Sequence, residues 1–203
     1  MSDEQGGPSV PADRLDDGGW ALEDETTETL FRLPAARVRG HTLLYEDDDL
    51  RAAVAAATDG ALDRMWRFFF ATSITFEPPL PPGVGTAMIS ATVRREAKKQ
   101  FADTLASRGF REVSTARSEQ LRIDGNRARL TAYDATLDVP VDGTERALPV
   151  TGWLGVWAHD GFRVAGGAYP ATPLGAFLDV SGVPDGGPRE FQNDLLALIR
   201  GVR

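Results

Sequence analysis

An aromatic run followed by a cluster of prolines constrains the fold more than any other feature of the sequence. Residues 63–83 read DRMWRFFFATSITFEPPLPPG. A helix that crosses a bilayer needs about 20 apolar residues, whereas Arg67 and Glu77 bracket a shorter run. Large apolar residues recur at alternate positions from Trp66 to Phe76, which is the period of a β-strand. Among a membrane anchor, a wall of a ligand site and a core strand, the pattern favours a core strand with a rigid, extended exit through the prolines.

Three segments have the apolar spacing and the end signals of helices. The first follows an N-cap among Asp47–Asp49 and ends at Gly60. The second, residues 90–108, stops at Gly109, and the third covers residues 188–201 with a proline in its first turn. The second has the clearest apolar stripe, with residues four positions apart: Val93, Ala97, Phe101 and Leu105.

Turn signals divide the rest of the chain into strands. Two short strands are expected at residues 28–33 and 37–45, and four antiparallel strands follow Phe110. The last two meet at Asp160-Gly161, a dipeptide typical of a two-residue hairpin turn. Counting outward from this turn predicts four cross-strand pairs: His159 with Phe162, Trp157 with Val164, Gly155 with Gly166, and Trp153 with Ala168.

This order of elements predicts an α+β fold. Strands and helices do not alternate regularly, which disfavours a doubly wound parallel sheet. We expect an antiparallel sheet of about six or seven strands with three helices packed on it. The order is compatible with a Mog1/PsbP-like sandwich, by analogy of fold alone. Residues 1–19, rich in Gly, Pro and Asp, are predicted to be a disordered acidic tail, and residues 20–203 a single α+β domain.

Composition and charge exclude several classes of function. The net charge is −8, and residues 1–49 carry 13 acidic and 4 basic side chains. Nucleic acid is disfavoured as a partner, because phosphate binding needs clustered Lys and Arg. Cysteine is absent, which excludes disulfides, thiolate nucleophiles and cysteine-ligated metals. The acidic, polar N-terminus has no signal-peptide pattern, so we expect a cytoplasmic protein without a membrane partner.

Three segments resemble those of a group of uncharacterised haloarchaeal proteins. They are TETLFRLPAARVRGHTLLYED at 27–47, WRFFFATSITFEPPLPPG at 66–83 and GWLGVWAHDGFRVAGGAYP at 152–170. The resemblance covers most of the chain after Trp20 and implies a salt-adapted cytosolic origin. It implies no activity, cofactor or catalytic residue. The preference for arginine, 20 of the 22 basic residues, fits a high-salt cytosol.

The last hairpin offers the best candidate for a binding site. On the predicted pairing, two tryptophans flank a floor of two glycines beside a histidine; these residues are Trp153, Gly155, Trp157, Gly166 and His159. Bare glycines in strands mark the close approach of a ligand or another backbone, although a helix packed on the floor would need the same glycines. A long loop at residues 171–187 could border such a pocket. We therefore interpret the chain as a non-catalytic domain, without cofactor, that binds a small apolar ligand or a protein partner.

An enzyme of unrecognised type is the alternative. His41 and His159 are the two histidines, and histidine is the side chain that titrates near neutrality without perturbation. Either could act as an acid–base group with a carboxylate from the middle strands, namely Asp124, Asp134 or Asp138. The sequence has no zinc-protease, phosphate-loop, nucleophile-elbow or dinucleotide-binding motif, so no catalytic residue is assigned.

Three charged or glycine-containing segments have simpler explanations than a site. Residues 46–49, EDDD, could bind a hard cation, but helix capping already explains acidic residues there. Residues 83–88 place glycines before a helix and could bind an anion. The second helix carries Arg94, Arg95, Lys98 and Lys99, which form a solvated face or bind an acidic ligand. No metal site is assigned.

Overall fold

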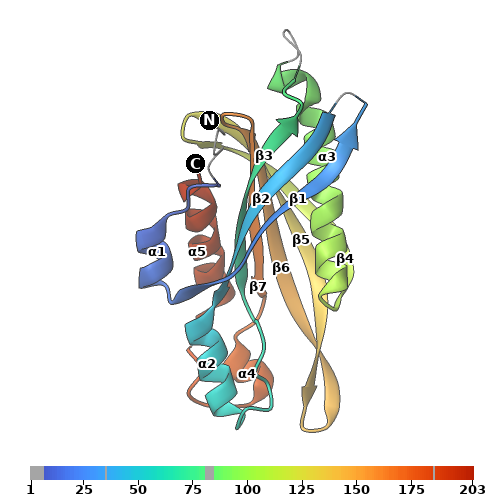
Figure 1. Cartoon of the computed structure of the whole chain (residues 1–203). Helices are drawn as coiled ribbons and strands as arrows, with labels where there is room; N and C mark the ends of the chain where they lie inside the picture. Colours follow the sequence, from blue (N-terminus) through green and yellow to red (C-terminus); the bar gives the residue numbers. More distant parts are fainter. Residues whose placement is uncertain (1–6, 35, 81–84, 185) are drawn as a thin grey trace.

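Seven strands form one antiparallel sheet within the residues that the structure describes (Figure 1). The structure is a computed structural model, and it describes residues 7–34, 36–80, 85–184 and 186–203. The strand order is β1-β2-β3-β7-β6-β5-β4. The strands are β1 (Trp20–Leu33), β2 (Ala36–Asp47), β3 (Phe68–Glu77), β4 (Phe110–Ile123), β5 (Asn126–Val141), β6 (Thr144–Ala158) and β7 (Phe162–Pro170). The helices are α1 (Ala12–Asp17), α2 (Asp48–Ala57), α3 (Thr86–Ser107), α4 (Leu174–Leu178) and α5 (Pro188–Gly201). The predicted α+β class is confirmed.

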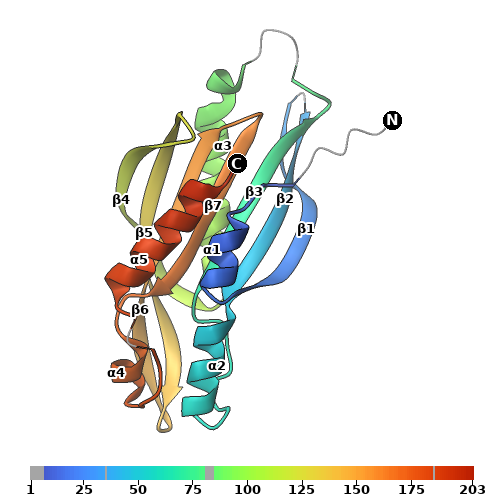
Figure 2. The same ribbon diagram turned by 90° about the vertical axis from the view of Figure 1, so that its left-hand side faces the viewer.

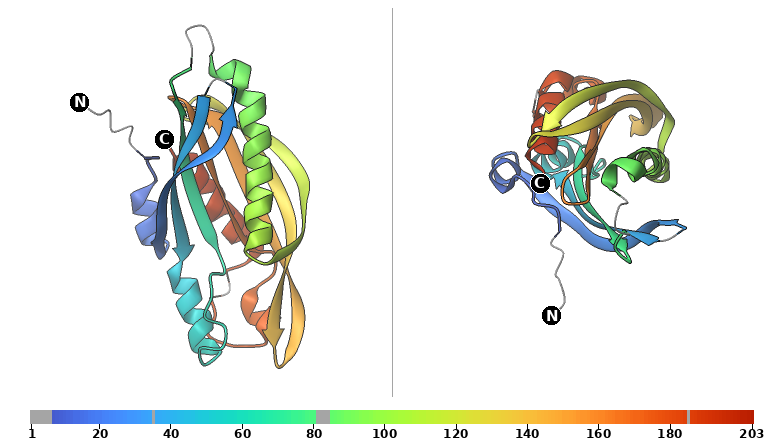
Figure 3. Two further views of the ribbon diagram at one scale, coloured as in Figure 1. Left: turned by 45° about the vertical axis from the view of Figure 1, so that its right-hand side comes forward. Right: turned by 90° about the horizontal axis from the view of Figure 1, so that it is seen from above.

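The two longest helices lie on opposite faces of this sheet. α3 packs against β4 and β6, whereas α5 packs against β7 and β3. Seen from above, the sheet curls around α3, with β1 and β4 on either side of the helix (Figure 3). α5 lies outside this curve, and α1 lies on the same side against β1 (Figure 2). The sheet therefore has a concave face toward α3 and a convex face toward α5.

Glycines in β6 let both helices approach the sheet closely. A Cβ atom at Gly152 would lie 3.2 Å from the ring of Phe101 in α3. A Cβ atom at Gly155 would lie 3.3 Å from Ile199 in α5. Because side chains alternate along a strand, even-numbered residues of β6 face α3 and odd-numbered residues face α5. The core therefore has two layers, one on each face of the sheet.

A buried arginine joins three segments at one end of the sheet. The guanidinium of Arg67, just before β3, donates to Asp47 at 2.6 Å and to Asp194 of α5 at 2.8 Å. The side chains of Arg67 and Asp47 are each 6% exposed. The guanidinium carbon also lies 4.8 Å from the ring centroid of Trp20 and 4.1 Å from that of Phe191. Burial raises the pKa of Asp47, and the charge of Arg67 opposes that rise.

Most elements lie where the sequence predicted them, but several ends differ. The strands expected at 28–33 and 37–45 are longer, as β1 and β2, and the loop at 171–187 contains α4. The predicted disordered tail also differs from the structure. Within it, residues 12–17 form α1, whose Leu15 is buried, and the backbone of Ser9 exchanges two hydrogen bonds with Arg203. Residues 1–6 lie outside the described residues.

The predicted register of the last hairpin is wrong by one residue. The loop has three residues, 159–161, in which the His159 amide donates to the Gly161 carbonyl at 3.2 Å and Asp160 and Gly161 both have positive φ. The pairs are therefore Ala158 with Phe162, Trp157 with Arg163, Gly155 with Ala165, and Trp153 with Gly167. A slip of one residue exchanges the two faces of a strand. Gly155 and Gly166 consequently face opposite sides of the sheet and do not form one floor.

We expect Arg67→Met to destabilise the protein strongly. It would leave Asp47 buried without its cationic partner, and breaking a buried ion pair costs about 3–5 kcal/mol. Urea denaturation should show this loss in the free energy of unfolding. Arg95→Met is the matched control. Arg95 also forms an ion pair, with Glu96, but its side chain is 71% exposed, and exposed ion pairs contribute about 0–1 kcal/mol. Equal effects of the two substitutions would contradict the role of Arg67.

Candidate functional site

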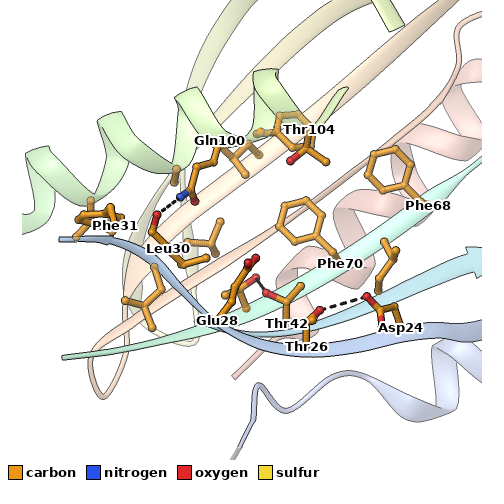
Figure 4. A pocket seen from close by; sticks show the side chains of 18 of the residues that line it. Asp24, Thr26, Glu28, Leu30, Phe31, Thr42, Phe68, Phe70, Gln100 and Thr104 are labelled. Carbon is orange, nitrogen blue, oxygen red and sulfur yellow. Dashed lines mark hydrogen bonds between the residues drawn. The ribbon is translucent and has the colours of Figure 1, made fainter. Parts of the chain in front are cut away.

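A cavity of about 230 Å³ lies on the concave face between α3 and strands β1, β2 and β3 (Figure 4). We call it the α3 cavity. α3 packs mainly toward β4 and β6, so the side of the helix that faces β1–β3 is not filled by other elements. The cavity interior is apolar. Its lining includes Leu44, Phe68, Phe70 and Ile74 from the sheet and Phe101 from α3. The aromatic run that the sequence predicted as a strand therefore forms one wall of this space.

The aromatic walls are positioned by glycines of the neighbouring strands. Phe70 pairs across the sheet with Gly166, and a Cβ atom at Gly166 would lie 3.0 Å from the Phe70 ring. The rings of Phe70 and Phe101 are 5.8 Å apart between centroids, and Phe101 lies over Gly152. A side chain at either glycine would displace these rings. The glycines thus act through packing and set the shape of the cavity.

Two threonines place hydroxyl groups on the otherwise apolar floor. Thr42 of β2 and Thr72 of β3 are directly opposite each other, and their hydroxyl oxygens are 2.8 Å apart. Thr72 is 5% exposed. One hydroxyl donates to the other, which leaves one further hydroxyl proton and unused lone pairs at the floor. The floor can therefore bond a polar atom of an enclosed molecule.

The solvent edge of the α3 cavity is polar on both sides. β1 contributes Asp24, Thr26 and Glu28, all exposed; on the other side lie Thr104 of α3 and Arg108, which directly follows the helix, and both are exposed. Asp24 accepts a hydrogen bond from Thr26 at 3.2 Å. The arrangement separates an apolar interior from charged and hydroxyl groups at the rim, as in small-molecule sites.

A bulge in β1 ties that strand to α3. The pairing with β2 shifts between Thr29 and Phe31, which leaves Leu30 outside the regular ladder. The freed carbonyl of Leu30 accepts a hydrogen bond of 2.7 Å from the Gln100 side chain of α3. The Leu30 side chain occupies the space above Gly40, where a Cβ atom would lie 2.7 Å away. The bulge thus connects the edge of the sheet to the helix across the cavity.

The structure does not bring the five predicted site residues together. Trp153 is buried on the convex side, where its Nε1 donates to the Tyr169 hydroxyl at 3.3 Å. Gly155 lies under Ile199 of α5, so a helix covers it. Gly166 faces the opposite side and lies under Phe70. Trp157 is 2% exposed, and His159 is the first residue of the hairpin loop.

The two histidines lie apart from the α3 cavity. His41 Nε2 is 2.7 Å from Glu25 on the neighbouring strand. His159 Nδ1 is 3.9 Å from Asp124 and 3.4 Å from the Asn126 amide nitrogen. The structure thus places one predicted aspartate near His159, and both histidines are partly exposed. Asp134 and Asp138 lie farther along β5, and Asp138 pairs with Arg111.

The acidic segment at residues 46–49 is used in structural contacts. Glu46 is buried and accepts a hydrogen bond from Arg51 at 2.8 Å. Asp47 caps α2 by accepting from the Leu50 amide at 2.9 Å, as predicted, and it pairs with Arg67. Within the described parts of the chain, no group of three or more His, Asp or Glu side chains is arranged to hold a metal ion. The glycine segment at 83–88 lies partly outside the described residues.

The comparisons with known proteins show the family of the chain. The chain belongs to a family described as a domain of unknown function, DUF6517, whose model matches residues 7–203. No curated protein and no solved structure matches the chain. In the described ranges, none of the helices is both long enough and apolar enough to span a bilayer.

Sequence reasoning identified both walls of the α3 cavity but not the space between them. The alternating run placed Phe68, Phe70 and Ile74 on one face of a strand, and helical spacing placed Ala97 and Phe101 on one face of α3. Both faces are buried or nearly so. The gap depends on which strands the helix packs against, and local patterns do not determine that choice.

We expect Gly155→Val to destabilise the protein, because its branched side chain would push against Ile199 of α5. Such overpacking typically costs about 1–3 kcal/mol. The matched control is Ala147→Val, an exposed position on the same strand, which should change stability by less than about 0.5 kcal/mol. Chemical denaturation of both variants would measure the difference. A Gly155→Val protein as stable as the control would indicate an uncovered surface at the hairpin.

Proposed function

We propose that this protein is a non-catalytic binding domain that holds a small apolar molecule in the α3 cavity. The observation that supports this most is the separation of an apolar interior, walled by Phe68, Phe70 and Phe101, from a polar rim. Ligand pockets have this combination of apolar walls and few polar groups. An empty apolar space of this kind otherwise lowers stability, because its lining loses contacts.

The chemistry of the α3 cavity suggests the kind of ligand. Its volume of about 230 Å³ is below the range of about 300–1,000 Å³ typical of drug-sized ligands, which favours a short aliphatic or single-ring molecule. The hydroxyl pair of Thr42 and Thr72 would bond a carbonyl or hydroxyl oxygen on that molecule. A polar end would lie at the rim formed by Asp24, Glu28 and Arg108.

An enzymatic role has less support. A general acid or base must lie within hydrogen-bond reach of a substrate atom, and neither His41 nor His159 lines the α3 cavity. His159 and Asp124 are near the end of a hairpin, where both side chains are partly exposed to solvent. A binding role requires no residue beyond those that line the cavity.

Filling the cavity should abolish ligand binding without unfolding the protein. Ala97 lines the cavity and is 8% exposed, so Ala97→Leu places added carbon atoms in the empty space. We expect it to weaken binding of 1-octanol, a short aliphatic molecule, at least about tenfold, a loss of about 1.4 kcal/mol. The melting temperature should stay equal or rise, as in cavity-filling substitutions generally. Isothermal titration calorimetry with 1-octanol and thermal denaturation measure the two effects.

Ala91→Leu is the control, because Ala91 is an exposed residue of the same helix and is not part of the cavity lining. It should leave the affinity for 1-octanol unchanged. Unchanged binding in Ala97→Leu, with the protein still folded, would refute the α3 cavity as the binding site.

A further inference from the structure

A second hollow, of about 510 Å³, lies near the beginning of α3 on the same face of the sheet. Its lining comes from the first turns of α3 and from β4, β5, β6 and β7, whereas the α3 cavity is lined mainly by β1–β3 and a later part of α3. The charged residues of its lining are three arginines: Arg94 of α3, and Arg127 and Arg129 of β5. We call it the arginine hollow. None of its described lining residues is acidic.

These arginines have no carboxylate partner in the part of the chain that the structure describes. The ion pairs found there, with N to O distances up to 4.0 Å, include neither Arg94 nor Arg127 nor Arg129. Arginines on the same helix and on the adjacent strand do have partners: Arg95 pairs with Glu96 at 3.3 Å, and Arg117 pairs with Glu119 at 3.0 Å. The chain as a whole is acidic, with a net charge of −8. Carboxylates are thus abundant in the protein but absent from this lining.

A fourth arginine increases the positive charge beside the hollow. Arg122 of β4 is directly opposite Arg127 in the ladder, and Gln120 is opposite Arg129. Residues directly opposite in an antiparallel pair share a face, and like charges at such positions are destabilising. The Arg122 side chain donates to the Gly125 carbonyl at 3.1 Å, which does not neutralise its charge. The nearest turn contributes Asp124, whose carboxylate lies near His159 and Arg203 instead.

The remaining lining adds backbone amide groups at the start of α3 and a small apolar wall. The Ser90 hydroxyl accepts a hydrogen bond from Arg94 at 3.3 Å and donates to the Ala87 carbonyl at 3.1 Å, so its proton is already used. The first turn of α3 has no acidic residue to offset the partial positive charge of its amide groups. Ala87 and Ala158 are not buried and supply apolar surface, whereas Phe162 is buried. A ligand that fits both the arginines and the apolar wall has an anionic group and an apolar portion.

We propose that the arginine hollow is a binding site for a phosphate group carried by a small molecule. Arginine forks bind phosphate oxygens in pairs of parallel hydrogen bonds, and a doubly charged group would relieve the repulsion between Arg122 and Arg127. The site is distinct from the α3 cavity, since the two linings have no residue in common, although β6 and β7 contribute to both. The bound group would be held by Arg94, Arg127 and Arg129, with the apolar portion against Ala87 and Ala158.

Isothermal titration calorimetry of the full chain with sodium pyrophosphate, at constant ionic strength, tests the site. We expect saturable binding with one site per chain, and at least a tenfold weaker affinity in the double variant Arg127→Gln/Arg129→Gln. The control is Arg39→Gln/Arg95→Gln, which removes the same charge from arginines paired with Glu77 and Glu96. Its affinity should stay within twofold of the unmodified protein.

A second measurement separates a ligand site from a structural role of these arginines. Without pyrophosphate, Arg127→Gln should keep or raise the melting temperature, because it removes a like-charge pair. The rise in melting temperature caused by pyrophosphate should be lost in this variant. The proposal is overturned if the unmodified protein shows no saturable binding, if the control variant loses as much affinity as the hollow variant, or if sulfate and pyrophosphate compete equally at the same ionic strength.

Discussion

Arg67 carries a buried charge at the point where the sheet, α2 and α5 meet, and the placement of these elements depends on it. Its two carboxylate partners come from the start of α2 and from α5. Because an unpaired charge at this depth would be costly, Arg67, Asp47 and Asp194 hold the start of β3 against both helices. The aromatic residues that follow in β3 are thereby placed under α3. The ion pairs act at one end of the sheet, yet they position a wall of the cavity.

The two faces of the sheet are covered to different extents. On the convex side α5 packs closely over glycines of β6 and β7, and its Leu195 and Ile199 are buried. On the concave side α3 packs toward β4 and β6 and meets β1 through the Gln100 bond to Leu30. The strands curl around α3 (Figure 3), and the side chains between α3 and β1–β3 leave the α3 cavity. The α3 cavity and the arginine hollow are both parts of this concave face.

Much of the fold follows from local patterns in the sequence. Apolar residues at alternate positions between Trp66 and Phe76 predict β3. Apolar residues four positions apart predict the four buried residues of α3. The hairpin register could not be predicted, because Asp160-Gly161 adopts positive φ in a three-residue loop as readily as in a two-residue turn. That one residue decides which glycines share a face. The two candidate sites depend on packing between segments distant in sequence: Arg94 and Arg127 are adjacent only after α3 has docked.

Methyl NMR spectroscopy can show whether the α3 cavity accepts an apolar molecule. Titration of the ¹³C-methyl-labelled protein with 1-octanol would report separately on the two faces of the sheet. We expect shift changes at the cavity methyl groups of Leu44, Ile74 and Val93, and none at Leu195 and Ile199 of α5. Shift changes confined to the α5 side, or absent from both faces, would contradict this expectation.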